Sequence, residues 1–113
     1  MPVRSLDSSV LKWPDRAAVD RAVRQWAERA AGSPNVVRIG YAGSYARGDW
    51  GPGSDVDIVI IVREAAVPFE RRALDWDATE LPVPADVLVY TRDEWREQER
   101  KGASLAREAV WVA

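Results

Sequence analysis

Residues 43–60 read GSYARGDWGPGSDVDIVI, and the last part of this stretch decides the fold. The run Val56–Val62 is apolar on both faces from Ile58 onward, which predicts a central strand buried on both sides. Two aspartates, Asp55 and Asp57, stand at its entrance. Because side chains alternate along a strand, both carboxylates point the same way, about 6–7 Å apart at the backbone. Like charges at this spacing repel and are costly to desolvate, and a divalent cation between them removes both problems.

The residues ahead of the aspartates favour this metal interpretation. Gly43 and Ser44 follow a predicted strand, and a glycine there lets the backbone approach a ligand closely. The Ser44 hydroxyl and the freed N–H groups can hold phosphate oxygens, and Arg47, one helical turn further on, can reach the same phosphate. Ordinary alternatives exist: Gly–Ser is a frequent loop pair, Arg47 can be a solvated surface charge, and a D-x-D pair is often only a turn.

Outside this stretch, the sequence predicts a small α/β domain whose elements follow the order α, β, β, α, β, α. Helical and extended periodicities, with their start and stop residues, place each element. The predicted elements are a helix with Pro14 in its first turn that ends at Gly32, a strand over 36–43, the strand over 56–62, a short helix from Pro68, a strand over 83–90, a helix over 92–101, and a tail over 104–113 that begins helical and ends extended. Thr91 and Glu94 form a capping box at the start of the helix over 92–101.

Asp86 supplies a third carboxylate, near the start of the predicted strand over 83–90. If that strand pairs beside 56–62, three acidic groups meet at one edge of the sheet. Three carboxylates with phosphate-binding donors opposite them describe a two-metal phosphoryl or nucleotidyl transfer site. The alternative is that Asp86 only caps the turn at the prolines before it.

Composition narrows the possible chemistry. The chain has 113 residues, 47% of them apolar, which suits a single domain over 1–113 with a real core. It has no cysteine and no histidine, so thiol nucleophiles, Ser–His pairs and most transition-metal sites are excluded. The net charge of −2 comes from 16 basic and 18 acidic residues in mixed order, so direct nucleic-acid binding is not expected. No apolar run has the length of a membrane span and the N-terminus has no signal-like run, so we expect a soluble, cytoplasmic protein with no membrane partner.

The pattern Gly43-Ser44, ten intervening residues, then Asp55-Val56-Asp57 resembles the G-S-x10-D-x-D signature of the DNA polymerase β-like nucleotidyltransferase superfamily. Within it, the chain is most similar to the minimal nucleotidyltransferases (MNT), which are often encoded beside a HEPN-domain partner. The match extends through Ala46-Arg47-Gly48 and Ser54, takes Asp86 as the third acid, and covers about residues 36–90 by motif. The resemblance implies a small nucleotidyltransferase fold of the α/β (α+β) class, with a mixed central sheet of three to four strands flanked by helices.

The resemblance also implies a role for each matching residue. Gly43, Ser44, Arg47 and Ser54 would bind the nucleotide phosphates, and Asp55, Asp57 and Asp86 would be the catalytic residues and the ligands of two Mg²⁺ ions. Asp86 would also help to deprotonate the acceptor hydroxyl. The reaction would be attack on the α-phosphate of a nucleoside triphosphate, ATP by expectation, with release of pyrophosphate.

The partner and the acceptor are expectations of the same kind. MNT proteins act as antitoxins that neutralise a HEPN ribonuclease toxin by binding it, and some transfer AMP to a toxin tyrosine. Larger relatives carry a further domain that holds the acceptor, and this chain is expected to receive its acceptor from a partner protein, within a homo- or hetero-oligomer. Two alternatives stay open: a non-catalytic module that neutralises its partner by contact, and a nucleotidyltransferase acting on a small molecule such as an aminoglycoside.

Trp50 is the one tryptophan expected in a loop, where burial in the core is difficult. Its indole is expected either to stack on a nucleobase or contact a partner, or to pack over its own loop.

Overall fold

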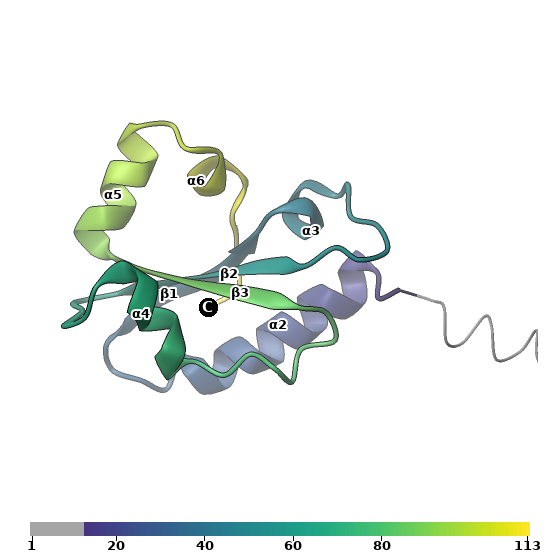
Figure 1. The fold of residues 1–113 in the computed structure, drawn as a ribbon, viewed down its shortest axis with the longest axis horizontal. Coiled ribbons are helices and arrows are strands. Elements are labelled where there is room, and N and C mark those ends of the chain that lie inside the picture. The colour runs from purple at the N-terminus through teal and green to yellow at the C-terminus, as the bar shows by residue number, and fades with distance from the viewer. Residues whose placement is uncertain (1–12) are drawn as a thin grey trace, which may run out of the picture.

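The computed structural model describes residues 13–113, and the prediction for the N-terminal segment before Trp13 lies outside this range. Within it, four strands form one mixed sheet with helices on both sides (Figure 1). The strands are β1 Val36–Ala42, β2 Val56–Val62, β3 Ala85–Thr91 and β4 Val110–Trp111. The helices are α2 Arg16–Ala30, α3 Ser44–Arg47, α4 Phe69–Arg72, α5 Arg92–Arg100 and α6 Ser104–Glu108, and a 3-10 turn, η1, covers Ala73–Asp75.

The strands lie in the order β3-β2-β1-β4, so β2 is internal, as its apolar sequence predicts. β1 runs antiparallel to both β2 and β4, whereas β3 runs parallel to β2. The parallel pair sets Asp57 directly beside Asp86. The expected mixed sheet of three to four strands is therefore confirmed, and with it the α+β class.

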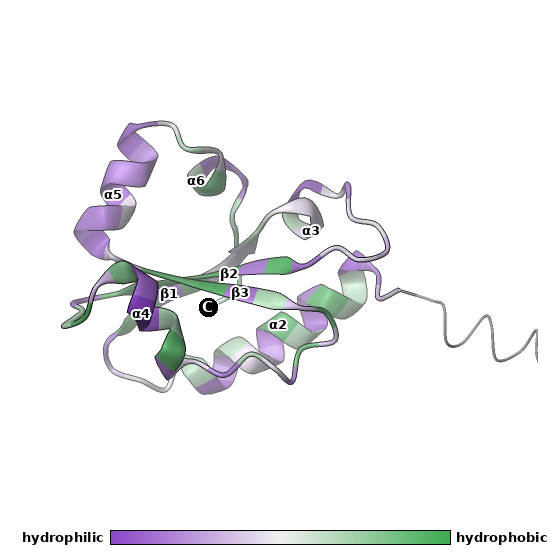
Figure 2. Ribbon diagram, in the orientation of Figure 1, coloured by the Kyte–Doolittle hydropathy of each residue, from purple (hydrophilic) through white to green (hydrophobic). Residues whose placement is uncertain are grey.

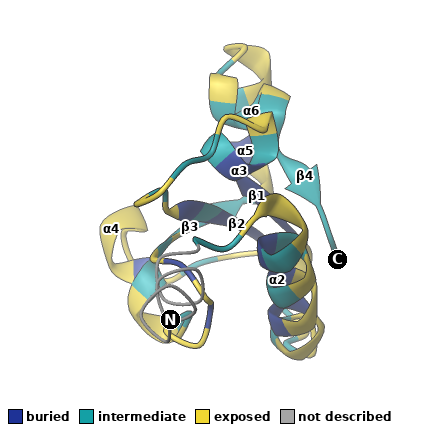
Figure 3. Cartoon of the chain, turned by 90° about the vertical axis from the view of Figure 1, so that its right-hand side faces the viewer, coloured by how far each residue is buried: buried dark blue, intermediate teal, exposed yellow. Residues whose placement is uncertain are grey.

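The first core layer lies between the sheet and α2. Val19, Val23 and Trp26 face the sheet from α2 and are buried against alternate residues of β2. Figure 3 shows this buried face of α2 and its exposed outer face. Fully burying one Val or Ile side chain contributes about 1.5–3 kcal/mol, so this layer supplies a large part of the folding free energy. The Trp26 Nε1–H also donates to the Asp77 carbonyl at 2.8 Å, which ties α2 to the segment leading into β3.

The second core layer lies on the opposite side of the sheet, under α5 and α6. Val59 and Ile61 of β2 pack there with Trp95 of α5, and Trp111 meets Trp95 edge-on with ring centroids 5.4 Å apart. The outer face of α5 is strongly hydrophilic, as Figure 2 shows. None of the helices in residues 13–113 has the length and apolar character that crossing a bilayer requires.

Several predicted boundaries shift for identifiable reasons. The first helix is capped by Asp15, whose carboxylate accepts from the Ala18 N–H, so Pro14 precedes the helix and does not lie in its first turn. The third strand begins at Ala85 and not at residue 83, because prolines 82 and 84 have no N–H to donate to a ladder. The capping box at Thr91 and Glu94 is confirmed, as is the helix and short strand of the tail.

Candidate active site

Gly43 forms the turn between β1 and α3 and has a backbone that only glycine adopts readily, with φ 89° and ψ −158°. A Cβ added at this position would lie 2.9 Å from Oδ2 of Asp57. The Gly43 backbone therefore passes close to the Asp57 carboxylate, and its expected close approach to a phosphate ligand stays a prediction. Ser44 begins α3 and Arg47 ends it, which confirms that one short helical turn separates them.

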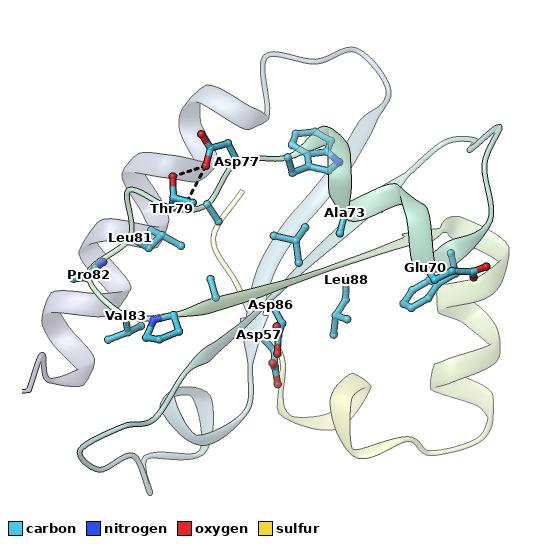
Figure 4. A pocket seen from close by; sticks show the side chains of 16 residues that line it. Asp57, Glu70, Ala73, Asp77, Thr79, Leu81, Pro82, Val83, Asp86 and Leu88 are labelled. Atoms are coloured by element: carbon cyan, nitrogen blue, oxygen red, sulfur yellow. Dashed lines mark hydrogen bonds between the residues drawn. The ribbon is translucent and has the colours of Figure 1, made fainter.

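The three predicted acids come from two neighbouring strands. Asp57 and Asp86 are register partners, and their side chains lie side by side on the same side of the sheet (Figure 4). Asp55 stands just before β2 and is exposed, as is Asp86, whereas Asp57 is partly buried. The sequence-based pairing of the third strand beside β2 is thus correct, and the third acid lies at the same edge as the D-x-D pair.

Asp57 is the group whose ionisation this environment perturbs. Partial burial raises its pKa, and the negative charges of Asp55, Asp86 and Glu108 raise it further, against a smaller lowering effect of Arg47. The arrangement is therefore rich in negative charge. A divalent cation relieves this repulsion, and carboxylate oxygens are the ligands that Mg²⁺ prefers.

In residues 13–113, no three acidic side chains are gathered closely enough to enclose a metal ion as they stand. This agrees with the exposure of Asp55 and Asp86, whose side chains have room to rotate. Since Mg²⁺ usually keeps several waters and takes ligands from substrate phosphates, a dedicated protein cage is not required for its binding. The donor set fits such a partly hydrated ion.

Glu108 is the site residue that sequence reasoning missed. Its carboxylate accepts from the Gly43 N–H at 3.0 Å and from the Arg47 guanidinium, with Nη1 3.3 and 3.4 Å from its two oxygens. Arg47 also pairs through Nε with Asp49 at 3.1 Å. Glu108 lies 65 residues after Gly43, and only the pairing of β4 with β1, which the sequence pattern does not reveal, brings the two together.

Two other predicted contributors have local partners. The Ser54 hydroxyl accepts from the Gly51 N–H at 2.8 Å and so closes the loop before β2. Trp50 stacks on Tyr45, with ring centroids 5.6 Å apart and planes inclined by 7°, and packs against the core. Of the alternatives for Trp50, packing within the fold is observed, against Tyr45 of α3, and contact of its half-buried indole with a nucleobase or a partner stays a prediction.

An open trough of about 900 Å³ begins at Asp57 and Asp86 and follows the outer edge of β3 (Figure 4). Leu88 and Val87 contribute from the strand, and Phe69 of α4, Ala73 of η1 and Trp76 just after η1 are among the other residues that line it. The trough therefore lies on the side of Asp86 away from the Gly43 turn. Its position allows a second, bulky group to reach the acids without crossing that turn.

Comparison with known proteins assigns the chain to a family. A family model described as "Nucleotidyltransferase domain" matches residues 20–109, which include every predicted site residue. The chain belongs to this nucleotidyltransferase family. A solved structure of a candidate nucleotidyltransferase from Sulfolobus solfataricus is similar, with a TM-score of 0.61 and 18% identity over 85% of this chain and 80% of that one. A search of curated proteins finds no match.

The family and the fold together fix the coarse activity. A chain of the nucleotidyltransferase family with this mixed sheet is a transferase, and nucleotidyl transfer in general is its class of reaction. At 18% identity, the similarity to the Sulfolobus solfataricus structure supports the fold alone.

Proposed function

We propose that this nucleotidyltransferase transfers AMP from ATP, with Mg²⁺, to a hydroxyl of a partner protein, and that it is the antitoxin of a HEPN/MNT pair. The observation that carries the proposal is the register of the parallel strands, which sets Asp57 beside Asp86 while the Gly43 turn lies against Asp57. The groups proposed to bind phosphate thus lie beside the carboxylates, at the same end of these strands.

The triphosphate would be held by groups at the end of β1. The Gly43 N–H and the Arg47 guanidinium already donate to a carboxylate in this structure, so both are directed at an anion. The Ser44 hydroxyl stands next to Gly43 at the start of α3. Charge-assisted hydrogen bonds from such donors are about twice as strong as neutral ones.

Asp55, Asp57 and Asp86 would hold the two Mg²⁺ ions. When bound, Mg²⁺ neutralises charge on the triphosphate and makes the acceptor hydroxyl easier to deprotonate. Burial raises the pKa of Asp57, and the negative charges of its neighbours raise it further; this excess of negative charge supports the assignment, because it favours cation binding.

Asp86 would receive the proton of the attacking hydroxyl. The acceptor oxygen forms a bond to the α-phosphorus, the bond from that phosphorus to the bridging oxygen breaks, and pyrophosphate leaves. Asp86 is exposed and lines the trough, so it can meet an acceptor that enters from the outer edge of β3. Positioning of the two reacting groups supplies much of the catalysis in such reactions.

The acceptor would be a protein side chain, with a tyrosine hydroxyl of the toxin as the expected case. The trough of about 900 Å³ is large and open enough for a segment of another protein, and it is lined mainly by apolar side chains. The assignment of the partner as a HEPN toxin rests on the resemblance of the motif to the MNT group.

The test uses ATP labelled in turn at the α- and γ-phosphate, with Mg²⁺ and the product of the adjacent reading frame. Label from the α-phosphate should appear on the partner, and label from the γ-phosphate should not. Asp57→Asn should abolish transfer, while Asp93→Asn, an exposed change on α5, should not. No transfer by the folded wild-type protein to this partner, or equal transfer by Asp57→Asn, would refute the proposal.

A second candidate function is neutralisation by contact alone. It is favoured by the observation that Glu108 occupies the Gly43 and Arg47 donors while the acids are not gathered around a common point. Under this alternative, the double variant Asp55→Asn/Asp57→Asn still protects cells from the toxin. Loss of protection with complex formation intact would exclude it.

A further inference from the structure

We propose that Glu108 is a built-in competitor of the nucleotide, whose carboxylate must leave the Gly43 N–H and the Arg47 guanidinium before a triphosphate can bind them. The inference rests on the function proposed above, because it concerns the same phosphate donors. It makes the affinity for nucleotide depend on a residue far from the G-S and D-x-D motifs.

The position of Glu108 is fixed by strand pairing. β4 runs antiparallel to β1 with Tyr41 opposite Val110, so Glu108, two residues before Val110 at the end of α6, comes beside Gly43, two residues after Tyr41. The Gly43 N–H donates to Oε1 at 3.0 Å, and the Glu108 side chain is only 18% exposed. The carboxylate is therefore held in the turn by the fold and is not a surface group that happens to reach it.

The anchoring of β4 keeps the tail in place. Trp111 lies against Gly40, where an added Cβ would come within 2.7 Å of its ring, and the Arg38 guanidinium stands 3.8 Å above the same ring. The main chain continues the pairing, since the Val112 N–H donates to the Ile39 carbonyl at 2.8 Å. Release of the donors thus requires rotation of the Glu108 side chain, with the tail still attached.

The position of the Glu108 carboxylate is also unfavourable for Asp57. Glu108 adds negative charge beside Asp57, and a phosphate would bring the same charge accompanied by its metal. A triphosphate with Mg²⁺ therefore replaces the Glu108 carboxylate with a more favourable free energy than a bare anion does. The competitor selects for a metal-bound polyphosphate over free phosphate.

The test measures binding without chemistry. Calorimetry with Mg²⁺ and tripolyphosphate, and separately with Mg²⁺ and ATP, compares the wild type with Glu108→Gln. The Gln side chain keeps the size but loses the charge, so binding of both probes should tighten about five- to tenfold, the scale of the difference between a charge-assisted and a neutral hydrogen bond. Glu99→Gln is the matched control, since it removes one negative charge from the exposed face of α5 and should leave both affinities unchanged. In an Arg47→Ala background, the gain from Glu108→Gln should shrink.

Each result decides between the two proposals. Unchanged or weaker binding of tripolyphosphate by Glu108→Gln overturns the competitor role, as does an absence of binding to both proteins. Tighter binding without any AMP transfer supports the competitor and refutes the proposed function. A measurement on the wild type alone avoids any folding defect: titration with Mg²⁺ and tripolyphosphate should shift the NMR signals of the Gly43 amide and the Arg47 Nη–H groups, which contact Glu108, and their constancy would overturn the proposal.

Discussion

At the scale of single residues, two positions define the site, and a simple substitution at either would remove the property that matters. Asp57 places a carboxyl group where burial and neighbouring acids raise its pKa, and Gly43 has a backbone conformation that other residues avoid. Both features oppose stability. They are typical of sites where function sets the residue, because a stable fold alone would favour a neutral side chain at the first and a different turn at the second.

Asp57→Asn should raise the stability of the metal-free protein at pH 7, by a few degrees in Tm. The pKa of Asp57 is raised on folding, so the folded state binds this proton more tightly than the unfolded state. The free energy of unfolding therefore falls as pH rises from the ordinary value of 3.8 through the raised pKa, and Asn removes that loss. Thermal denaturation in EDTA should show the difference between the proteins closing as pH falls below 3.8. A variant less stable than the wild type at pH 7 would contradict the assignment.

Gly43→Ala should lower the free energy of unfolding by about 1–3 kcal/mol from its backbone conformation alone, which is essentially restricted to glycine, and should also weaken ATP binding. The added Cβ would press on the Asp57 carboxylate. Gly51→Ala is the matched control in the same loop region, because a Cβ there meets nothing within 4 Å and its φ is not positive. Urea denaturation and calorimetry measure the two effects, and equal behaviour of both variants would argue against a special role for Gly43.

At the scale of elements, the site depends on where β3 and β4 are held. β3 carries Asp86 and lies at one edge of the sheet, while β4 carries the segment that delivers Glu108 at the other. The apolar sequence pattern of β2 does not by itself determine where either strand lies. Each is tied down by contacts with residues distant in sequence.

Arg72→Ala should destabilise the protein by about 2–4 kcal/mol. The buried guanidinium pairs with Glu94 at 2.5 Å, donates to the Val89 carbonyl of β3 at 3.1 Å and donates to the Val67 carbonyl at 2.9 Å, so one side chain joins α4, β3 and α5. Arg71→Ala, at the exposed neighbouring position, should change stability by less than about 0.5 kcal/mol. Chemical denaturation measures both, and similar losses would show that the pair at Arg72 is not what holds α4.

Gly40→Ala should detach β4 from β1. A Cβ at this position would lie 2.6 Å from the Val110 carbonyl oxygen and 2.7 Å from the Trp111 ring, so the strands must separate. Hydrogen exchange should then speed up at the Val112 and Ala113 amides, which donate to Ile39, while amides in α2 stay protected. Unchanged exchange at the tail would mean that the tail is held without this close contact.

The same elements show which parts of the fold and of the site follow from the sequence. The apolar run after Asp57 predicts the central strand, and the alternation of side chains predicts that the D-x-D pair shares one face, because both follow from local periodicity. The sequence could not predict the pairing of β4 with β1, since a strand of two residues has no periodicity. Glu108 was missed for this reason, and Trp50 is placed by its stacking on Tyr45, which no local pattern indicates.

At the scale of the whole molecule, the proposed groups follow the order of the strands. The Gly43 turn ends β1, Asp55 and Asp57 open β2, Asp86 opens β3, and the trough runs along the outer edge of β3. A nucleotide held at the first would present its α-phosphate over the acids, with the acceptor entering from the trough. If the proposed function holds, the sheet would arrange nucleotide, metal ligands and acceptor in the order of its strands.

The most direct test of this account is to locate a bound metal–nucleotide by NMR, using Mn²⁺ in place of Mg²⁺ with a non-hydrolysable ATP analogue. A metal–nucleotide bound at the acids should selectively broaden the amide signals around Asp55, Asp57, Asp86 and Gly43, and this broadening should be lost in Asp57→Asn. Broadening confined to other acidic residues, such as Asp77 and Glu80 before β3, or a pattern unaffected by Asp57→Asn, would contradict it.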